Sequence, residues 1–316
     1  MKTFLKIFLI AFLFFALAMG AGLWTFSKIY EPPVSEGFEN KSPIEIEDSR
    51  NGEIVAEKTE LEKLIEGSKR INILLMGMEG PRSDTLILAS FDPDSNNLDL
   101  ISIPRDTYYP RKGYDAADQK KLNAAYGNEG AQGTMSAVSN ILGGVPIHNH
   151  VRITYTGVER IVDSLGGIKI NIPMDMEYDD PYDTPPLSIR LQKGSQVLNG
   201  QKAIQFLRFR KSNNGGGYPD GDLGRMKAQQ QFVKAAMAKV LSFRLPVVAN
   251  TAFKHIKTDM ALPDILGLAT EAVGMKGDNI RTYSLPGSAT EKGISYFIHD
   301  PNASEEMMKQ IYKKQE

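Results

Sequence analysis

The chain of 316 residues contains no cysteine. A thiol nucleophile, a disulfide framework and any cysteine-ligated zinc or iron–sulfur site are therefore excluded. Its formal net charge of −1 provides no overall attraction for nucleic acid. The sequence also contains no GxSxG elbow, Walker-type phosphate loop, HExxH or GxGxxG motif. These absences argue against a serine hydrolase, an ATPase, a metalloprotease and a dinucleotide-binding enzyme.

The N-terminus contains a long uncharged segment. Residues 7–24 carry no charge and are rich in Phe, Leu, Ile and Ala; as a helix they would span roughly 27 Å, close to the thickness of a bilayer core. Lys2 and Lys6 precede this run, and the sequence that follows is acidic. The positive-inside rule therefore predicts a transmembrane anchor over 1–28, with a cytoplasmic N-terminus and the rest of the chain outside the cell. The alternative is a cleaved signal peptide, since Ala16-Leu17-Ala18 resembles a cleavage site.

The next segment, 29–66, is acidic, contains several prolines near its start and has few large apolar residues. Such a composition buries too little surface to fold alone, so we expect an extracytoplasmic linker. Its last residues, from Thr59, predict a short helix with a capping box completed by Glu62. The remainder, 67–316, is long enough for one large domain.

Apolar periodicity and turn signals place strands and helices along this domain. Strands are predicted at 71–77, 85–91, 97–103, 168–172 and 280–285, and helices at 134–142, 155–165, 199–206, 223–243 and 303–312. Because strands alternate with helices, we expect an α/β fold, an α-β-α sandwich around a central mixed sheet.

Three arginines and two other polar residues lie close together in the second half of the chain. Arg208 and Arg210 are followed, after a glycine-rich segment, by Asp222, Arg225 and Gln229. Arginine binds phosphate oxygens bidentately, and Arg225 and Gln229 would share one helix face near an N-terminus. Each arginine taken singly is more simply a surface charge or an ion-pair partner, but the cluster favours an anion site.

Acidic residues and arginines also lie at the ends of the first predicted strands: Glu79, Arg82, Asp84, Arg105 and Asp106. Glu79 follows the first strand and Asp84 opens the second, so their carboxylates are expected to approach each other. Two such oxygens beside a phosphate suit Mg²⁺, or one of them could act as a general base. The simpler alternative is that both carboxylates cap backbone amides in turns.

Seven segments together resemble the LytR-CpsA-Psr family of membrane-anchored bacterial cell-wall phosphotransferases. They are INILLMGMEG, RSDTLILASF, LDLISIPRDTYYP, LNAAY, IVDSLGGIKI, LNGQKAIQFLRFR and DGDLGRMKAQQQFV. The resemblance covers residues 71–312 and the anchor. It implies transfer of an anionic glycopolymer, such as teichoic acid or capsule, from undecaprenyl pyrophosphate to peptidoglycan, with a divalent ion.

The resemblance also implies roles for individual residues. The pyrophosphate would be bound by the residues Arg82, Arg105, Arg208, Arg210, Asp222, Arg225 and Gln229. The catalytic set would be Asp84, Arg105, Arg208, Arg210 and Arg225. Asp84 and Glu79 would bind Mg²⁺ or Mn²⁺, although the family usually has Asp at the position of Glu79.

The expected partners are therefore a polyprenyl-pyrophosphate-linked glycopolymer, peptidoglycan and the membrane, but no nucleic acid. Two other functions remain open. The same site could use water as the acceptor, which would make the protein a pyrophosphatase or phosphodiesterase. A non-enzymatic wall scaffold or regulator is the other alternative, although a pure binder has little need for a metal pocket.

Overall fold

The computed structural model describes residues 58–184, 186–240, 252–272, 275, 277–290 and 293–313. The predicted anchor and most of the predicted linker lie outside these ranges. Within them, no helix combines the length and the apolar character that a bilayer crossing requires.

A mixed sheet of six strands forms the centre of the fold, in the order β10-β3-β2-β1-β4-β9. Its strands are β1 (Ile71–Glu79), β2 (Arg82–Asp92), β3 (Asn97–Ile103), β4 (Asn149–Thr154), β9 (Ile256–Thr258) and β10 (Ile280–Ser284). β1 pairs in parallel with β4, and β3 pairs in parallel with β10. The other neighbours are antiparallel.

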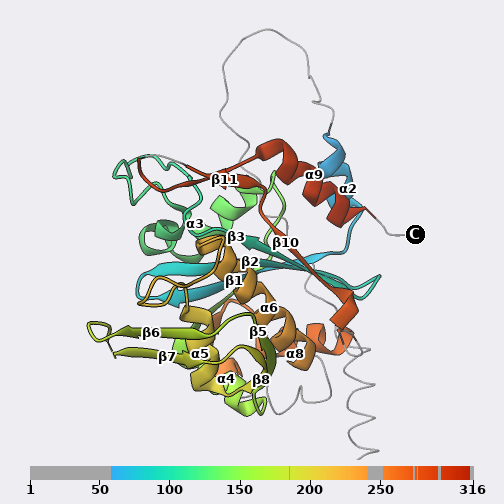
Figure 1. The fold of residues 1–316 in the computed structure, drawn as a ribbon. Helices are drawn as coiled ribbons and strands as arrows, with labels where there is room; N and C mark the ends of the chain where they lie inside the picture. Colours follow the sequence, from blue (N-terminus) through green and yellow to red (C-terminus); the bar gives the residue numbers. More distant parts are fainter. Residues whose placement is uncertain are drawn as a thin grey trace, which may run out of the picture.

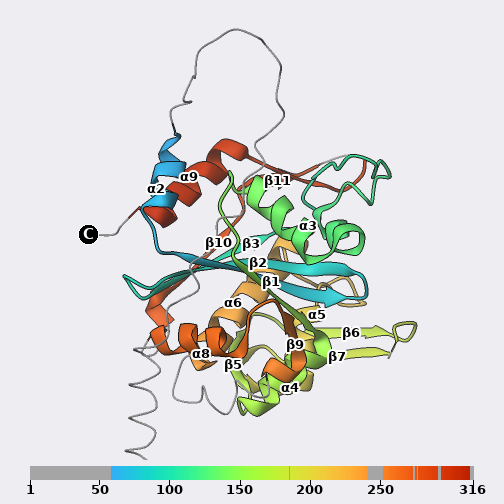
Figure 2. The same cartoon turned by 180° about the vertical axis from the view of Figure 1, so that it is seen from behind.

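Helices cover both faces of this sheet (Figures 1 and 2). One face carries α2 (Glu60–Glu66), α3 (Ala125–Ile141) and α9 (Pro301–Tyr312). The other carries α4 (Tyr155–Ser164), α5 (Gly200–Arg208), α6 (Asp222–Val240) and α8 (Leu262–Glu271). Two short 3₁₀ helices span Leu122–Ala124 and Gly277–Asn279. The predicted mixed α/β sandwich is confirmed.

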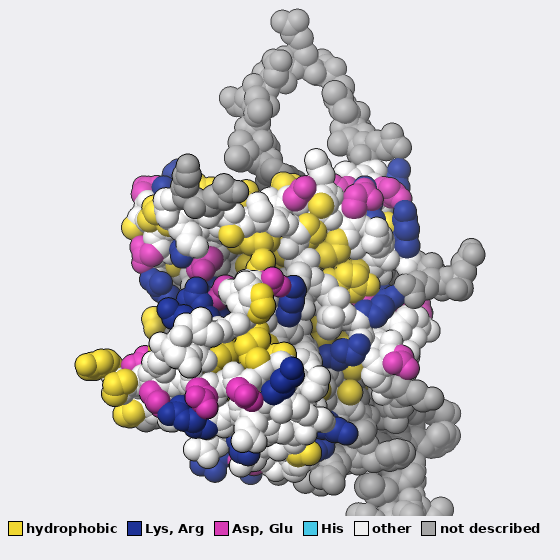
Figure 3. Space-filling view, viewed as in Figure 1, with side chains coloured by type: hydrophobic (Ala, Val, Ile, Leu, Met, Phe, Trp, Pro, Cys, Tyr) yellow, Lys and Arg dark blue, Asp and Glu magenta, His cyan; other side chains and the backbone are white. Residues whose placement is uncertain are grey.

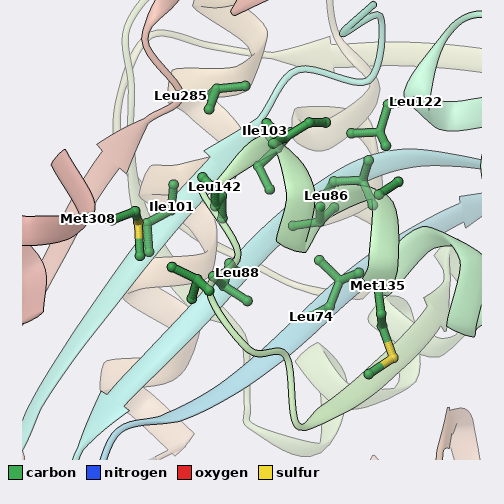
Figure 4. Close-up of a cluster of buried hydrophobic side chains, with 14 of the residues drawn as sticks. Leu74, Leu86, Leu88, Ile101, Ile103, Leu122, Met135, Leu142, Leu285 and Met308 are labelled. Atoms are coloured by element: carbon green, nitrogen blue, oxygen red, sulfur yellow. The ribbon is translucent and has the colours of Figure 1, made fainter. Parts of the chain in front are cut away.

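The side chains of β2 point alternately to the two faces of the central sheet, which explains why both faces are apolar. Leu86 and Leu88 belong to the core beneath α3 and α9, whereas Ile87, Ala89 and Phe91 belong to the opposite one. Side chains alternate between the faces of a strand, so a continuous apolar run supplies both cores. Figure 4 shows the first of these cores, where leucines and isoleucines of neighbouring strands meet side chains of the covering helices.

Three small antiparallel pairs lie outside the central sheet. They are β5 (Ile168–Ile172) with β8 (Gly194–Leu198), β6 (Met176–Asp180) with β7 (Leu187–Leu191), and β11 (Gly287–Ala289) with β12 (Phe297–His299). The first two pairs pack with α4, α5 and α6 into a third core, around Phe206 and Phe209. The β6–β7 hairpin projects beyond the body of the molecule (Figure 1).

Helix α2 belongs to the folded body. Thr59 caps it with the predicted capping box, because the side chains of Thr59 and Glu62 each accept a hydrogen bond from the other's backbone N–H. Leu61 is only 1% exposed and joins the core together with Met307 and Met308 of α9. The folded part therefore includes α2, which the predicted domain boundary at residue 67 assigns to the linker.

Leu61→Ala is expected to lower the free energy of unfolding by about 2–5 kcal/mol, because it leaves a cavity in a core that cannot fully collapse. Glu66→Ala on the same helix should change it by less than about 0.5 kcal/mol, since the ion pair of Glu66 with Lys58 is exposed. Urea unfolding followed by circular dichroism measures both. Equal effects of the two substitutions would show that α2 is not part of the core.

Most predicted elements are found close to their expected ends, and the clearest difference is at α3. This helix begins at Ala125, well before the predicted start at Thr134. Gly130 interrupts it with φ 68°, a conformation that glycine adopts readily. The predicted start therefore falls just after this kink. The glycines in the first turns of α3 are poor helix formers, so the sequence did not indicate a helix there. The last residues of the predicted helix 223–243 lie outside the described ranges.

Candidate functional site

The two predicted carboxylates meet where β1 turns into β2. Glu79 ends β1, Gly80 makes the turn with φ 61°, and Asp84 follows within β2. Burial, and then a hydrogen bond with the Asp84 carboxyl, raise the pKa of Glu79. The expected approach of these carboxylates is observed, and their mutual repulsion makes this a place where added positive charge is stabilising.

Arg105 joins this pair from the end of β3. Pro104 turns the chain there, and Arg105 Nη1 lies 2.8 Å from Asp84 Oδ1. The Arg105 Nε atom is buried and has no hydrogen-bond partner among the described residues. A buried N–H without a partner is costly, so this guanidinium has a donor available for an anion.

Arg208 is the last residue of α5 and is held by three neighbours. Its Nη2 atom lies 3.0 Å from Glu79 Oε1 and 2.8 Å from Asp183 Oδ2. Its Cζ atom lies 5.1 Å from the centroid of the Tyr155 ring, within the range of a cation–π contact. Burial, together with Glu79 and Asp84, raises the pKa of Tyr155 to about 12, so its hydroxyl stays protonated at neutral pH.

The first turns of α6 carry the other predicted residues. Arg225 Nη2 lies 2.7 Å from Asp222 Oδ1, and Arg210 Nε lies 3.9 Å from the same oxygen. Asp222 Oδ1 thus lies within ion-pair distance of both arginines. Phe209, which lies between Arg208 and Arg210 in the sequence, is fully buried. The two arginines therefore flank an inward-pointing residue.

Two predicted residues have further contacts of their own. The Gln229 side chain accepts a hydrogen bond from Thr85 Oγ1 and donates one to the Leu207 carbonyl, each at 3.3 Å. Gln229 thus joins α6 to β2 and to α5. Arg82 donates to Asp118 at 2.7 Å, and its ion pair is largely exposed. Arg82 lines the same cavity as Arg105 and Arg210.

Two cavities meet at Asp84 and Arg105, which among the described residues are the only two that line both. The first is a slot of about 20 Å³ between β2, β3 and α6, with Leu86, Ile103 and Met226 in its wall. This is room for about one water, so the slot itself is too small for a lipid tail. The second cavity, of about 420 Å³, is polar and also includes Arg82 and Arg210.

Sequence reasoning did not assign roles to several residues that the fold brings to the site. They are Tyr155 and Asp183 beside Arg208, and Asp118, Lys121 and Asn123 in the polar cavity. Lys121 directly precedes the LNAAY segment and Asn123 lies within it, so this segment was a usable signal. Tyr155 begins a helix and Asp183 lies in a hairpin loop, and nothing local to either residue indicates the arginine they contact.

The surface around the site is of mixed charge. Figure 3 shows acidic and basic side chains interspersed over one face, with apolar side chains between them. Exposed apolar atoms lie at the tip of the β6–β7 hairpin, where Tyr182 is 94% exposed.

Comparison with a family model identifies the protein family to which this chain belongs. The model of the LytR_cpsA_psr family matches residues 36–313. The chain belongs to the LytR_cpsA_psr family. The resemblance to this family that the sequence indicated is therefore confirmed.

Similar family members have been named and solved. Two Bacillus subtilis proteins, polyisoprenyl-teichoic acid–peptidoglycan teichoic acid transferases TagV and TagU, are each 29% identical to this chain. The TagV match covers 77% of the chain and 64% of TagV, and the TagU match covers 81% of each. The chain thus spans less than two thirds of TagV's full length.

Solved structures of this family share the fold. The crystal structure of TagV from B. subtilis has a TM-score of 0.65 at 28% identity, covering 78% of this chain and 96% of that one. A structure of TagT bound to LIIa-WTA has a TM-score of 0.61 at 25% identity, covering 78% and 90%.

Proposed function

We propose that this chain is a phosphotransferase that moves an anionic glycopolymer, such as a teichoic acid, from polyprenyl pyrophosphate to peptidoglycan. One observation carries the proposal: Asp84 and Arg105 lie where two cavities meet, and Arg82, Arg210 and Arg225 line one or the other of these cavities. Several arginines beside a carboxylate are suited to bind a pyrophosphate and a divalent cation. The names of TagV and TagU support the reaction type.

The arginines would bind the donor's pyrophosphate. Arg105 and Arg225 line the slot, and Arg210 lines the adjoining cavity. Each guanidinium has five N–H donors, so those engaged by carboxylates still have others for phosphate oxygens.

In the reaction, the oxygen of a peptidoglycan hydroxyl forms a bond to the phosphorus nearest the glycan. The bond from that phosphorus to the bridging oxygen breaks, and polyprenyl phosphate leaves. The hydroxyl proton passes to a carboxylate, Asp84 or Glu79. Arg105 and Arg208 stabilise the negative charge that spreads over the phosphoryl oxygens and the leaving group.

The carboxylate pair fits a divalent cation. In the described residues, no three Asp, Glu or His side chains form a complete metal site. Two carboxylates are nevertheless enough for Mg²⁺, which keeps waters and phosphate oxygens as its other ligands. Glu79 and Asp84 are close enough to raise the pKa of Glu79, and a cation would relieve this repulsion. When bound, Mg²⁺ or Mn²⁺ supplies positive charge to the pyrophosphate oxygens.

We further propose that residues 7–24 anchor the chain in the cell membrane, with the catalytic domain outside. The support is the sequence alone: an uncharged run of 18 residues after Lys2 and Lys6. This arrangement keeps the site near a donor that itself resides in the bilayer.

The test of the function is donor turnover by the full-length chain in detergent. Its substrates are a polyprenyl-pyrophosphate-linked glycan, Mg²⁺ and peptidoglycan oligomers. We expect polyprenyl phosphate to be released only with acceptor, and Arg105→Ala and Asp84→Ala to abolish the release. Equal release without acceptor would indicate a hydrolase. Donor binding without turnover would indicate a scaffold or regulator.

Removal of divalent ions is expected to reduce turnover by at least about 10²-fold, because a metal ion contributes several kcal/mol of charge stabilisation in such reactions. EDTA treatment followed by titration with Mg²⁺, Mn²⁺ or Ca²⁺ measures this, with Ca²⁺ as a larger ion of the same charge. Full activity after chelation would contradict the assignment of Glu79 and Asp84 to a metal.

A further inference from the structure

One arginine of the site is covered by a loop. Four of the five arginines assigned to the pyrophosphate line one cavity or both: Arg82, Arg105, Arg210 and Arg225. Arg208 is the fifth, and among the described residues it lines neither cavity. Its Nη2 atom lies 2.8 Å from Asp183 Oδ2 and 3.0 Å from Glu79 Oε1. These carboxylates therefore occupy donors that a phosphate would use.

Asp183 reaches Arg208 from the tip of the β6–β7 hairpin, which projects from the body (Figure 1). Among the described residues, this ion pair is the one hydrogen bond or ion pair that joins the tip, residues 181–184, to the rest of the protein. The other hydrogen bonds of the tip lie within the hairpin. Its other residues, Pro181, Tyr182 and Thr184, are exposed. Asp183 is thus the residue that fastens the tip to the site.

Arg208 does not need Asp183 in order to be held in place. Glu79 lies on the same nitrogen, and the Tyr155 ring lies against the guanidinium. Asp183 is moreover a third carboxylate beside Glu79 and Asp84. Burial and Asp84 raise the pKa of Glu79 most, and the charge of Asp183 adds to this rise. A third negative charge makes the site less favourable for a pyrophosphate.

A carboxylate and a phosphate compete for the same donors, because arginine binds both through the planar fork of its N–H groups. A phosphate oxygen bound to Arg208 Nη2 would take the position of Asp183 Oδ2. If the loop stayed in place, the phosphate would also lie beside the negative charge of this carboxylate. Binding of a phosphate to this nitrogen therefore requires Asp183 to leave.

We propose that Asp183 determines the affinity of the donor site: it occupies Arg208 until the donor's pyrophosphate displaces it, and the hairpin tip is then released. The inference rests on the proposed function in taking Arg208 as a pyrophosphate ligand. A ligand that must first displace a contact binds with a lower apparent affinity. The same contact favours release of the phosphate product, because Asp183 returns to Arg208 when the product leaves.

The test is the Kd of inorganic pyrophosphate for the full-length chain in detergent with Mg²⁺, measured by calorimetry. Asp183→Asn keeps the shape of the side chain and removes its charge. We expect this variant to bind pyrophosphate about fivefold more tightly, the effect of removing one partly exposed ion pair that competes with the ligand. A residue that served to orient Arg208 would give weaker binding on substitution, so weaker or unchanged binding would overturn the proposal.

Asp180→Asn is the matched control, because it removes one negative charge from the same hairpin. Asp180 accepts hydrogen bonds from the Tyr182 N–H and the Tyr178 hydroxyl, both within the hairpin. The control should change the Kd less than twofold. Equal tightening in the two variants would reflect the overall charge of the hairpin and would rule out a role for the specific contact.

Amide hydrogen exchange reports the release of the tip. Adding pyrophosphate to the wild type should speed the exchange of residues 179–184, because their fastening to Arg208 is lost. Asp183→Asn should show the faster exchange without ligand. Unchanged exchange in wild-type protein saturated with pyrophosphate would mean that Asp183 stays on Arg208, which contradicts the proposal.

Neither measurement requires turnover, so this inference and the proposed function can fail separately. If Asp183→Asn binds pyrophosphate more tightly but no protein releases polyprenyl phosphate with acceptor, the role of Asp183 stands and the transferase function fails. If the wild type transfers and Asp183→Asn binds pyrophosphate no more tightly, the transferase stands and the role of Asp183 fails.

Discussion

Arg208→Lys is expected to lower kcat for donor turnover by about 10²–10³-fold, the usual cost of removing one preorganised donor to a developing oxyanion. Arg208 contacts Glu79 and Asp183 through one nitrogen and lies over the Tyr155 ring. These contacts fix the plane of the guanidinium. A lysine ammonium keeps the charge but has neither the planar fork nor the same stacking, so it cannot present two parallel donors to a phosphate.

The control is Arg190→Lys, which makes the same exchange in an exposed ion pair with Asp179 on the β6–β7 hairpin. It should change kcat less than twofold, because an exposed pair contributes little. Steady-state kinetics on the full-length chain give both values. Near-wild-type kcat for Arg208→Lys would mean that Arg208 contributes only charge or acts outside the reaction.

Asp99→Ala is expected to cost about 3–5 kcal/mol of folding free energy, the loss typical of breaking a buried ion pair. Asp99 is fully buried in β3. It accepts two hydrogen bonds from Arg281, at 2.7 and 2.9 Å, and one from Arg70 at 2.8 Å. Removing the carboxylate leaves Arg70, whose side chain is 4% exposed, as a buried charge with a weaker partner.

Asp94→Ala is the matched control, since Asp94 pairs with Lys69 at the surface at 2.9 Å. Its cost should stay below about 1 kcal/mol. Urea unfolding of the three proteins under one condition provides the comparison. A loss for Asp99→Ala no larger than that for Asp94→Ala would show that the two arginines find other partners or water.

Four strands of the central sheet, β1, β2, β3 and β10, were predictable because short apolar runs between turn signals identify them as strands. The strands β4 and β9 were not predicted, because they are only partly buried and have no continuous apolar run. The β6–β7 hairpin was not predicted. Its first strand contains Asp179 and Asp180 before Pro181, which locally indicates a turn. The hairpin is held from a distance: the Asn213 side chain bonds the backbone N–H and C=O of Asp179 at 2.6 and 3.0 Å.

The candidate site was predictable where chemistry and strand ends coincide. Glu79 and Asp84 follow from the pairing of neighbouring strands, and Arg225 follows from helical spacing after Asp222. The place of Asp183 in the site could not be predicted, because its partner Arg208 is distant in sequence and the residues around Asp183 are those of an ordinary loop. Only the structure explains why a glycine stands at position 217, before Asp222. A Cβ there would lie 2.9 Å from the Arg210 carbonyl oxygen, which is too close.

The measurement that tests the central claim most directly is turnover in water enriched in ¹⁸O, with mass spectrometry of both phosphate products. The proposed transferase joins the glycan phosphate to a peptidoglycan hydroxyl, so neither that phosphodiester nor the released polyprenyl phosphate should gain ¹⁸O. Incorporation of one ¹⁸O into either product, at the rate of donor consumption, would show that water is the acceptor and would contradict the transferase.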